Sequence, residues 1–450
     1  MLLPILFYLF IVVGTINLLH FAFYLIGANI YDLQQFRNIK QRKQRLVSKP
    51  LVSVLIPAYN EERVIERNLQ SVWNNTYDSL EAIVINDGST DNTSEAVRRF
   101  IKSRSRSYRE TRARIVRSKN GLKRVWNRGN VPMQRRVKLV EQKNAGKAAA
   151  LNNGIRNHAK GELIMTLDAD SLIHKRAIYN AVKYFEDPSI AGVAANVRMI
   201  EEPSILGLLQ RFEHLISYRS KKLFSIANCE LIVGGVASTY RKSILDKVGQ
   251  YDTDTTTEDI GLSMKIAAAG NKKYRLVYGA DVAAMTEPVK GFRPLLRQRY
   301  RWKLGNLQNA YKYRSLIFSM DKRYTRTLTH YRMPMSFIGE ILLLMEPITL
   351  AYIIYLSIHF LTIGLILGAY MTITAYILMN IWPDEHMSRR GKIKSSVYAP
   401  FLYFIFYIMN VVQLIAALRC IGNAKRIANL TAQESTWTHV ERAGKAATFS

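Results

Sequence analysis

The chain has 450 residues and a formal net charge of +30, from 64 Lys or Arg against 34 Asp or Glu. Its two cysteines exclude a disulfide framework, and no Cys/His cluster in the sequence suggests a zinc site. The middle of the chain is polar and both ends are apolar, so we expect one large catalytic domain together with a membrane part.

The first predicted element is an apolar N-terminal helix. Residues 2–30 contain no Lys, Arg, Asp or Glu, and an apolar run of this length can cross a bilayer. A cleaved signal peptide, the alternative, would begin with a basic segment and have a shorter apolar core. Five cations lie between residues 37 and 45, and by the positive-inside rule they place the chain after residue 31 in the cytoplasm. We therefore predict a transmembrane helix over residues 1–31.

Strands and helices then alternate along the polar middle of the chain. Short apolar runs predict three strands, at residues 51–57, 81–85 and 161–167. Helix-like apolar spacing predicts helices between them, over residues 61–75, 95–101 and 145–159. Such alternation indicates βαβ units, that is, an α/β fold with a Rossmann-like, mostly parallel sheet.

Polar clusters follow three of the predicted strands. They read A-Y-N-E at residues 58–61, N-D-G at residues 86–88 and D-A-D at residues 168–170. Because ligands of such sheets bind beyond the carboxyl ends of the strands, the three clusters together predict a nucleotide pocket.

A basic stretch, about residues 102–138, separates the second strand from the third. Residues 101–140 hold 14 Lys or Arg against one Glu. We interpret the stretch as an insertion with one strand, at either residues 113–117 or residues 137–141. Nucleic-acid binding is one explanation of the charge, and attraction of a cytoplasmic loop to anionic lipid is the other. The second is favoured, since no nucleic-acid-binding motif is present, and no nucleic-acid partner is expected.

Asp168 and Asp170 stand two positions apart at the end of a predicted strand. In a strand such side chains point the same way, and two like charges held together need a cation. Mg²⁺ or Mn²⁺ prefers oxygen ligands of this kind and would bind a diphosphate at the same time. A turn or a helix cap is the plainer explanation of the pair.

Two further motifs carry residues suited to catalysis and to phosphate binding. T-E-D at residues 257–259 either caps a helix or supplies a general base, Asp259, for an acceptor hydroxyl. Q-R-Y-R-W at residues 298–302 offers arginine for diphosphate and tryptophan for a sugar face, but also suits an interfacial helix. We predict interfacial helices over residues 290–312 and residues 204–224.

The C-terminal part contains three apolar blocks, at about residues 335–358, 360–382 and 397–418. The link between the last two blocks is basic and is therefore expected in the cytoplasm. Three crossings would place the C-terminus outside, whereas the basic tail favours the inside. A re-entrant or interfacial block would reconcile the two.

Six motifs occur in one order along the chain: A-Y-N-E, N-D-G-S-T-D-N-T, N-A-G-K-A-A-A-L-N-N-G, L-D-A-D-S, T-E-D and Q-R-Y-R-W. In this the chain resembles the processive family 2 glycosyltransferases, the cellulose, chitin, hyaluronan and poly-N-acetylglucosamine synthases. The resemblance covers roughly residues 50–310. P-S-I-L-G at residues 203–207 and the stretch 251–260 are most similar to the bacterial poly-N-acetylglucosamine synthases.

The resemblance implies a GT-A fold and an inverting transfer from a UDP-sugar. Tyr59 and Glu61 would line the uridine site. Asp87 would hold the uracil or ribose side with Lys147 nearby, and Asp168 would contact the nucleotide. The chain has no G-x-x-x-x-G-K-[ST] motif, so the residues around Lys147 do not indicate an ATPase.

The resemblance also assigns the metal and the catalytic base. Asp170, together with Asp168, would ligate Mg²⁺ or Mn²⁺. Asp259 would be the general base, beside Glu258.

On the acceptor side, the resemblance assigns Gln298 and Arg301 to the diphosphate and Trp302 to stacking on the acceptor sugar. The tail S-T-W-T-H-V-E-R, residues 435–442, resembles a gating segment in which Trp437 and Thr438 would approach the catalytic pocket. An interfacial tryptophan is the alternative explanation of that tail.

Two features depart from the family pattern. The basic insertion is longer than expected. G-G-V-A-S-T-Y-R-K at residues 234–242 corresponds to an acceptor-side loop, but lacks the usual phenylalanine. These departures leave the linkage and the acceptor open.

These inferences predict a multi-pass protein of the inner cell membrane with a cytoplasmic catalytic domain. The predicted parts are residues 1–31, 50–315, 333–421 and a tail, 422–450. The expected function is polymerisation of a UDP-sugar, preferably UDP-N-acetylglucosamine, into a β-linked polysaccharide coupled to its export. The alternatives are a non-processive transferase acting on a lipid carrier and a basic membrane scaffold with an inactive transferase fold.

The expected partners are the UDP-sugar donor, the growing polysaccharide, membrane lipid and an accessory membrane subunit. A channel for the polymer would be lined by side chains that include Glu340 or Glu346. The alternative for these two glutamates is a position near the membrane boundary, facing water.

Overall fold

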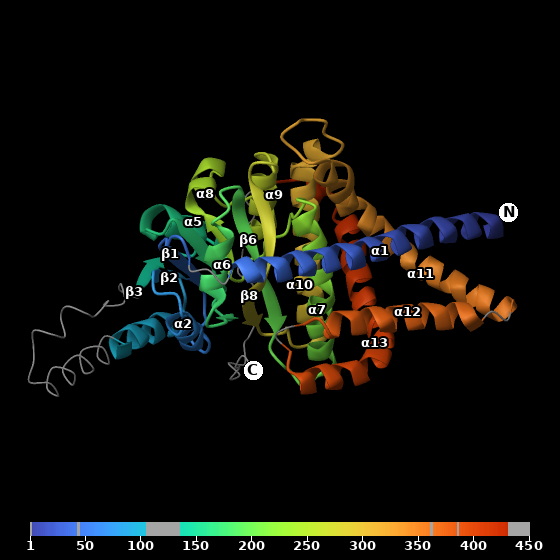
Figure 1. The fold of residues 1–450 in the computed structure, drawn as a ribbon, viewed down its shortest axis with the longest axis horizontal. Coiled ribbons are helices and arrows are strands. Elements are labelled where there is room, and N and C mark those ends of the chain that lie inside the picture. The colour runs from blue at the N-terminus through green and yellow to red at the C-terminus, as the bar shows by residue number, and fades with distance from the viewer. Residues whose placement is uncertain (1, 43–45, 105–135, 361–362, 385–386, 431–450) are drawn as a thin grey trace, which may run out of the picture.

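The computed structural model describes residues 2–42, 46–104, 136–360, 363–384 and 387–430 (Figure 1). Most of the predicted basic insertion lies outside the described residues. So do Trp437 and Thr438 and with them the predicted gating segment.

One mixed sheet forms the centre of the catalytic domain, in the strand order β3-β2-β1-β4-β7-β6-β8-β5. Strands β1 to β4 pair in parallel, and β6 also pairs in parallel with β8, whereas β7 and β5 pair in the antiparallel sense. The prediction of a mostly parallel α/β sheet is confirmed. The strands are β1 Val52–Ala58, β2 Leu80–Asp87, β3 Arg136–Gln142, β4 Leu163–Thr166, β5 Leu172–Ile173, β6 Ile190–Met199, β7 Ser238–Arg241 and β8 Arg275–Thr286.

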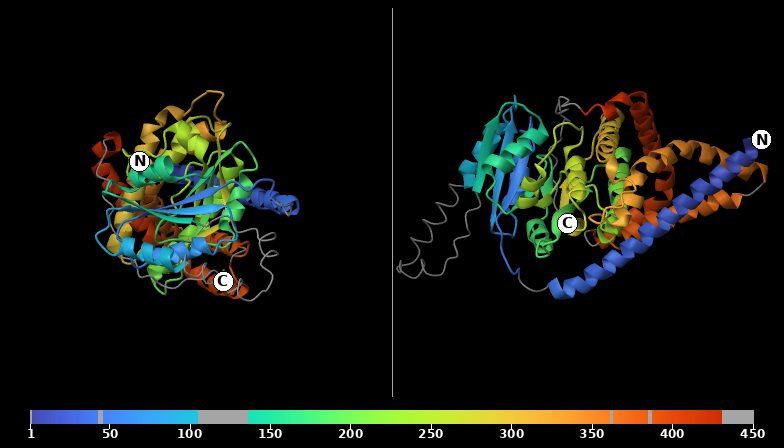
Figure 2. Two further views of the ribbon diagram at one scale, coloured as in Figure 1. Left: turned by 90° about the vertical axis from the view of Figure 1, so that its left-hand side faces the viewer. Right: turned by 90° about the horizontal axis from the view of Figure 1, so that it is seen from above.

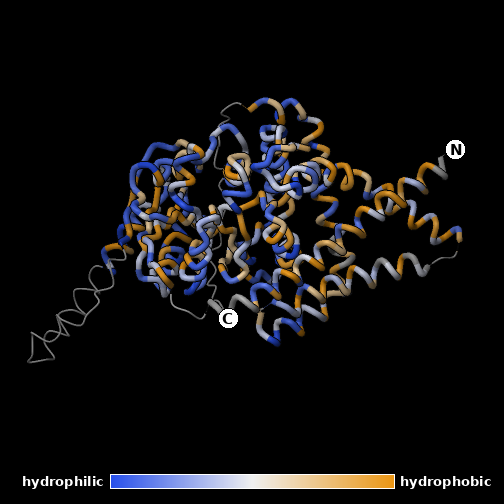
Figure 3. The backbone as a smooth tube through the Cα atoms, turned by 45° about the horizontal axis from the view of Figure 1, so that its top comes forward, coloured by the Kyte–Doolittle hydropathy of each residue, from blue (hydrophilic) through white to orange (hydrophobic). Residues whose placement is uncertain are grey.

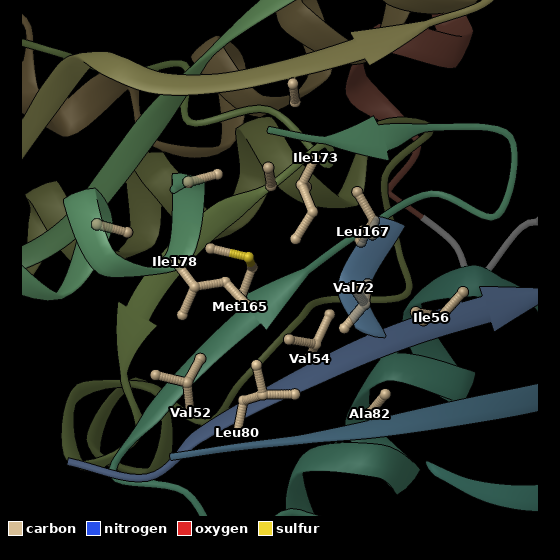
Figure 4. Close-up of a cluster of buried hydrophobic side chains, with 14 of the residues drawn as sticks. Val52, Val54, Ile56, Val72, Leu80, Ala82, Met165, Leu167, Ile173 and Ile178 are labelled. Carbon is tan, nitrogen blue, oxygen red and sulfur yellow. The ribbon is translucent and has the colours of Figure 1, made fainter. Parts of the chain in front are cut away.

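The central strands are buried on both faces, which explains their continuous apolar sequence. Every residue of β1 is buried, as parallel strands covered by helices require. Val54 and Ile56 of β1 lie in one apolar cluster with Met165 of β4 and Val72 of the first domain helix (Figure 4). The strand predicted at residues 137–141 is β3, the outermost strand of the parallel group.

Helices cover the sheet, and the predicted helices are present. The helix predicted at residues 145–159 begins as α5 and continues as a π-helical turn, Gly154–His158. A helix over residues 93–104 includes the predicted segment 95–101. The helices of the domain are α2 Ile65–Trp73, α5 Lys147–Asn153, α6 Ala177–Tyr184, α7 Ile205–Ile226, α8 Lys242–Val248, α9 Glu258–Ala268 and α10 Phe292–Lys312, with short 3-10 and π turns at Arg314–Leu316 and Thr327–Arg332.

Long apolar helices project from one side of the domain (Figures 1 and 3). Within the described residues, Ile5–Phe36 of α1 and Thr327–His359, which includes α11, are long and apolar enough to cross a membrane. The N-terminal end of α1, the C-terminal end of α11 and the start of α12 lie at the end remote from the domain (Figures 1 and 2). The bounds are α1 Leu2–Arg42, α11 Met333–His359, α12 Ile363–Ile381, α13 Arg389–Gly422 and α14 Lys425–Ala428.

Helix α1 is longer than predicted and reaches the domain. No Pro or Gly interrupts the sequence between Gly27 and Arg42, so nothing ends the helix at residue 31. Tyr31 is 3% exposed, and its hydroxyl donates to the carbonyl oxygen of Tyr278 at 2.7 Å. The end of α1 is therefore fixed to strand β8.

The third C-terminal apolar block does not make a straight crossing. Helix α13 bends by 63° between its parts Arg389–Leu402 and Tyr407–Gly422. Asp384, just before α13, pairs with Arg198 of the domain. After α13, the carbonyl oxygen of Arg426 accepts from Gln308 Nε2 at 2.9 Å. The residues just before and just after α13 thus both contact the domain, and the number of crossings and the side of the C-terminus stay predictions.

The two predicted interfacial helices, α7 and α10, lie between the sheet and the C-terminal helices. Phe212 of α7 packs in one apolar cluster with Ile377 and Ile381 of α12. Leu295 of α10 packs in another with Met409 of α13. Much of the apolar stripe of each helix is thus covered by protein, because the C-terminal helices fold back over it.

Candidate active site

The loops that follow β1 and β2 are tied together at the carboxyl edge of the sheet. The Asn60 side-chain oxygen accepts from the Thr90 backbone N–H at 2.8 Å, and the Glu61 N–H donates to the Thr93 hydroxyl at 2.8 Å. Tyr59 and Glu61 are partly buried in this region, at the end of β1. The structure therefore brings the two predicted uridine-site residues to the edge of the sheet where a nucleotide would bind.

Asp87 is buried and holds a neighbouring loop. Its side chain accepts hydrogen bonds from Gln142 Nε2 at 2.7 Å, the Ala145 N–H at 2.9 Å and the Gly146 N–H at 2.8 Å. With 0% of the residue exposed, these contacts make it a positioning residue for the segment that leads to Lys147. The predicted contact with uracil or ribose stays a prediction.

Lys147 is the cation at the centre of the site. Its Nζ lies 2.8 Å from Asp168 Oδ1 and 3.0 Å from Glu258 Oε1. Burial alone would lower the pKa of the ammonium, but the charges of Asp168, Glu258 and Asp259 raise that pKa above its ordinary value. Lys147 therefore stays charged. It forms ion pairs with Asp168, which follows the third predicted strand, and with Glu258 of the T-E-D motif.

The D-A-D segment lies in a turn beyond β4 rather than in the strand. The strand ends at Thr166, and the Ser171 N–H donates to the Asp168 carbonyl at 2.9 Å. The period-2 argument for two parallel carboxylates is therefore wrong here, because the backbone is no longer extended. Asp168 is partly exposed and pairs with Lys147, whereas Asp170 is 5% exposed and accepts from the Ser171 hydroxyl.

Two residues of α2, Arg67 and Asn68, donate hydrogen bonds to backbone carbonyls of this turn. The sequence analysis missed both. The buried side chain of Asn68 donates to the carbonyl oxygens of Asp168 at 2.9 Å and Ser171 at 2.7 Å. Arg67 donates to the Asp170 carbonyl at 3.2 Å and pairs with Glu287. Polar residues in an amphipathic helix ordinarily face solvent, so the local pattern of α2 gave no signal for this role.

Glu258 and Asp259 form the first turn of α9, so the helix-start explanation of T-E-D is confirmed, and the general-base role of Asp259 stays a prediction. Thr257 is the N-cap residue, and acidic side chains in a first turn are favoured by the helix dipole. Asp259 Oδ1 also accepts from the Ile260 N–H at 2.8 Å. Burial, followed by the charge of Glu258, raises the pKa of Asp259 to about 6, against the opposing effect of Lys147. A carboxylate with this pKa is suited to act as a general base near neutral pH.

The G-G-V-A-S loop after residue 233 closes against these charged groups. A Cβ placed on Gly235 would lie 2.8 Å from Lys147 Nζ and 3.4 Å from Asp168 Oδ1. A Cβ on Gly234 would face Asp259 Oδ2 at 3.8 Å. A side chain at Gly235 would displace the end of Lys147, so the small residues of this loop allow its close approach to the charged groups.

Helix α10 packs against the N-terminal end of α9. A Cβ on Gly305 would lie 2.3 Å from Thr257 Oγ1, and Asn309 Nδ2 donates to the Thr257 carbonyl at 3.1 Å. Sequence reasoning did not single out either residue, because their partner lies about 50 positions away. This packing fixes the orientation of α10 relative to Glu258 and Asp259.

Q-R-Y-R-W lies on α10, one to two turns before Gly305. Gln298 and Arg301 share a helix face with Gly305, since residues three and four apart are neighbours on a helix. Arg301 is exposed, and among the described residues it forms no ion pair. Trp302 is 36% exposed, and the guanidinium of Arg299 lies 4.3 Å from its ring centroid. Arg301 therefore lies on the same face of α10 as Gly305, which packs against Thr257 at the start of α9.

Arg299 has a structural role that the sequence analysis did not separate from that of Arg301. It is 1% exposed and pairs with Glu213 of α7 at 2.5 Å. The two arginines of the motif therefore differ: one joins α7 to α10, and the other faces outward.

The residues present fit a divalent metal bound jointly with a diphosphate. Asp168 and Asp170 supply only oxygen donors, and Asn68 holds the turn that carries them. In the described part of the chain no group of three or more Asp, Glu, His or Cys side chains could hold an ion by itself. Mg²⁺ commonly binds through one or two carboxylates and substrate phosphates, which is the arrangement this turn could complete.

The fold and the site together define a glycosyltransferase of the GT-A class. Residues 115–305 match the family model described as glycosyltransferase like family 2, and residues 53–131 match the model described as glycosyl transferase family 2. The chain belongs to glycosyltransferase family 2 through this domain.

Curated relatives and one solved structure are similar to the chain. It is 31% identical over 256 residues to the poly-β-1,6-N-acetyl-D-glucosamine synthase of Staphylococcus aureus strain COL, covering 56% of this chain and 54% of that protein. It is 32% identical over 257 residues to the synthase of the same name from Staphylococcus epidermidis, covering 56% and 54%. The chain thus matches about half the length of these relatives.

The solved structure is a mannosyltransferase from Pyrobaculum calidifontis in complex with GDP-mannose and Mn²⁺. The TM-score is 0.52 at 21% sequence identity, over 84% of this chain and 98% of that one. At this identity the likeness confirms the fold.

The raised pKa of Asp259 predicts a pH-dependent effect of Asp259→Asn on stability. Because the folded-state pKa of about 6 lies above the ordinary value of 3.8, this group favours folding at low pH and loses that contribution as pH rises through 6. The melting temperature of Asp259→Asn relative to wild type should therefore be higher at pH 8 than at pH 4.5, measured by thermal unfolding of the purified protein.

Asp321→Asn is the matched control for this measurement. Asp321 is partly exposed, and the hydrogen bonds that it accepts from Arg323 lower the pKa of its carboxyl. Its relative melting temperature should not rise between pH 4.5 and pH 8. A relative melting temperature of Asp259→Asn that is flat or falling over this range would contradict the assigned environment.

Proposed function

We propose that the protein transfers sugar from UDP-N-acetylglucosamine to the end of a growing β-linked polysaccharide. The observation that carries the proposal is the cluster in which one lysine, Lys147, joins Asp168 to Glu258 beside Asp259, whose pKa is raised to about 6. The similarity to poly-N-acetylglucosamine synthases supports this donor and this type of product.

In the proposed reaction an acceptor hydroxyl attacks the anomeric carbon while UDP leaves from the opposite face. Asp259 removes the proton from the hydroxyl, for which its pKa of about 6 is suited. Glu258 keeps that pKa raised and, with Asp168, keeps Lys147 in place. The inverting outcome follows from the single displacement.

The leaving diphosphate gains negative charge, and two cations of the chain can stabilise it. Lys147 lies at the Asp168 turn, and the exposed Arg301 can bind phosphate oxygens in bidentate fashion. A Mg²⁺ or Mn²⁺ ion at Asp168 and Asp170 would add Lewis-acid stabilisation of the diphosphate. Gln298 lies one turn before Arg301 on the same face of α10 and would bind the same group.

We propose that Tyr59, Glu61 and Asp87 form the nucleotide side of the site and Trp302 the acceptor side. Trp302 already carries Arg299 on one ring face, so its other face would stack on the sugar. The described tail supports the proposed approach of the last residues to the site, because Arg426 is bonded to Gln308, which also accepts from Thr256 next to T-E-D.

The proposal includes a place in the membrane and a route for the product. Helices α1, α11 and α12 would cross the bilayer, α13 would re-enter it, and the catalytic domain would lie in the cytoplasm. A cavity of about 440 Å³ between α1 and α11 is lined by Asn17, His20 and Glu346 among apolar residues. Polar groups inside a membrane commonly mark a substrate path, so this cavity supports coupled export.

Of the two glutamates considered for the channel, Glu340 and Glu346, only the second lines this cavity. Glu346 lines the cavity, whereas Glu340 pairs with Lys303 of α10 at 2.6 Å. We therefore propose Glu346 for the product path and assign Glu340 to the packing of α11 on the domain. An accessory membrane subunit would complete the wall of the product path on the side that α1 and α11 leave open.

Sugar incorporation by membranes that contain the protein tests the proposed reaction. With labelled UDP-sugars and Mg²⁺ or Mn²⁺, UDP-N-acetylglucosamine should give a large labelled polymer. Asp259→Asn should lower the rate by a factor on the order of 10²–10⁴, the usual contribution of a general base. The Asp321→Asn variant, at a position outside the catalytic cluster, should retain wild-type activity.

Other products would contradict the proposal in distinguishable ways. A product carrying a single sugar on a lipid would favour a non-processive transferase. Absence of any product together with loss of UDP binding would favour an inactive scaffold. Equal rates for wild type and Asp259→Asn would remove Asp259 from the mechanism.

The proposed membrane arrangement predicts where engineered cysteines are accessible. The native Cys229 and Cys420 are buried, so a membrane-impermeant maleimide should report on introduced cysteines. In intact cells His359→Cys, at the end of α11 remote from the domain, should be labelled. Lys425→Cys, beside α10, should be labelled only after permeabilisation. Labelling of Lys425→Cys in intact cells would contradict the cytoplasmic position of the C-terminal region.

A further inference from the structure

A second cavity, separate from the catalytic cluster, lies where the domain meets the apolar helices. It has a volume of about 770 Å³. Its walls come from the end of α1, from α6 and α7, from strands β6 and β8 and from the end of α12. None of the residues assigned to the transferase reaction lines it.

Three buried polar atoms of residues in its wall have no hydrogen-bond partner. They are the Tyr218 hydroxyl, Arg198 Nε and the side-chain oxygen of Asn196. Tyr218 is 8% exposed and Asn196 is 6% exposed. Buried polar groups are nearly always paired, so three such atoms around one cavity indicate a ligand that supplies the missing partners.

The charges of the wall indicate the kind of ligand. Cations outnumber carboxylates, with Arg176, Lys183, Arg198, Arg219 and Lys222 against Asp32, Asp281 and Asp384. Arg219 is 6% exposed, and its guanidinium donates to the side-chain oxygens of Asn380 and Asn29 and to the carbonyl oxygen of Met379. In the part of the chain that the structure describes, no carboxylate lies within ion-pair distance of it. A buried cation with only neutral acceptors favours an anion nearby.

Two donors and one acceptor are left open in the wall. The phenol of Tyr218 and the guanidinium of Arg198 can donate to phosphate oxygens. The side-chain oxygen of Asn196 can accept from a hydroxyl, because its own Nδ2 already donates to the Ala280 carbonyl at 2.9 Å. The set therefore suits a phosphate diester that also carries a hydroxyl group.

The surroundings of the cavity are apolar and lie at the ends of the projecting helices. Phe36 at the end of α1 is 69% exposed, and Met379 and Trp382 at the end of α12 are 50% and 52% exposed. Exposed apolar side chains next to a charged cavity match the boundary between acyl chains and headgroups of a bilayer.

We propose that this cavity binds the headgroup of an anionic phospholipid with a hydroxylated phosphodiester, such as phosphatidylglycerol. The inference rests on the proposed membrane location of α1 and α12, but not on the proposed reaction. Since the walls come from α1, α7, α12 and the sheet, a bound headgroup would join the membrane helices to the catalytic domain.

Thermal unfolding of the full-length protein in lipid nanodiscs tests this site without any sugar donor. Phosphatidylglycerol in a phosphatidylcholine bilayer should raise the melting temperature of the wild type by about 2–4 °C. Tyr218→Phe removes only the unpaired hydroxyl, so its stability in phosphatidylcholine alone should be equal to or higher than that of wild type. The rise in melting temperature that phosphatidylglycerol gives to Tyr218→Phe should be less than half of the rise in the wild type.

Controls separate the site from general charge effects. Arg198→Gln should reduce the gain from phosphatidylglycerol like Tyr218→Phe, whereas Tyr311→Phe and the exposed Arg314→Gln, both distant from the cavity, should keep the full gain. Soluble glycerol phosphate, added to phosphatidylcholine nanodiscs, should give no comparable shift.

The proposal is overturned if phosphatidylglycerol gives no gain, or if Tyr218→Phe gains as much as wild type. An equal shift with soluble glycerol phosphate would assign the cavity to a soluble phosphate ligand instead of a lipid. Because no activity is measured, any of these results leaves the proposed transferase reaction untouched.

Discussion

The charge of Lys147 is the interaction on which the rest of the site depends. Asp168, Glu258 and Asp259 come from two distant parts of the chain, and three carboxylates gathered together would repel one another. One ammonium group, 2.8 Å from Asp168 and 3.0 Å from Glu258, offsets this repulsion and stays charged because of it. Burial and the charge of Glu258 raise the pKa of the neighbouring Asp259 to about 6, and the lysine limits that rise.

Much of the surrounding fold serves to place these four groups. Asp87 uses its buried carboxylate to hold the segment before Lys147, and Asn68 holds the turn that carries Asp168. The lack of a side chain at Gly235 lets its loop approach the lysine, and the lack of one at Gly305 lets α10 approach Thr257. The apolar helices are attached to the same framework, since Tyr31 at the end of α1 bonds to strand β8.

The sequence predicts the parts of the site that local pattern encodes and misses those that depend on distant packing. The ends of β1, β2 and β4 follow from apolar runs that stop at polar clusters, and this is why residues 58–61, 86–88 and 168–170 could be predicted at one edge of the sheet. Asn68 and Gly305 could not be, because nothing near them in the sequence shows the turn or the helix end that they contact. The alternation argument for Asp170 failed, since a strand pattern does not show where the strand ends. The 63° bend of α13 and the contacts of its flanking residues with the domain likewise depend on distant packing, which hydropathy alone does not contain.

The pH dependence of kcat/KM for two variants of the cluster would test this account most directly. If Lys147 and Glu258 set the pKa of Asp259, the acid limb should move to higher pH in Lys147→Met, which removes a positive charge. It should move to lower pH in Glu258→Gln, which removes a negative one. Opposite shifts about a wild-type limb near pH 6 are the predicted result. Acid limbs that coincide in the wild type and both variants would contradict the account, because the base would then not be coupled to this lysine.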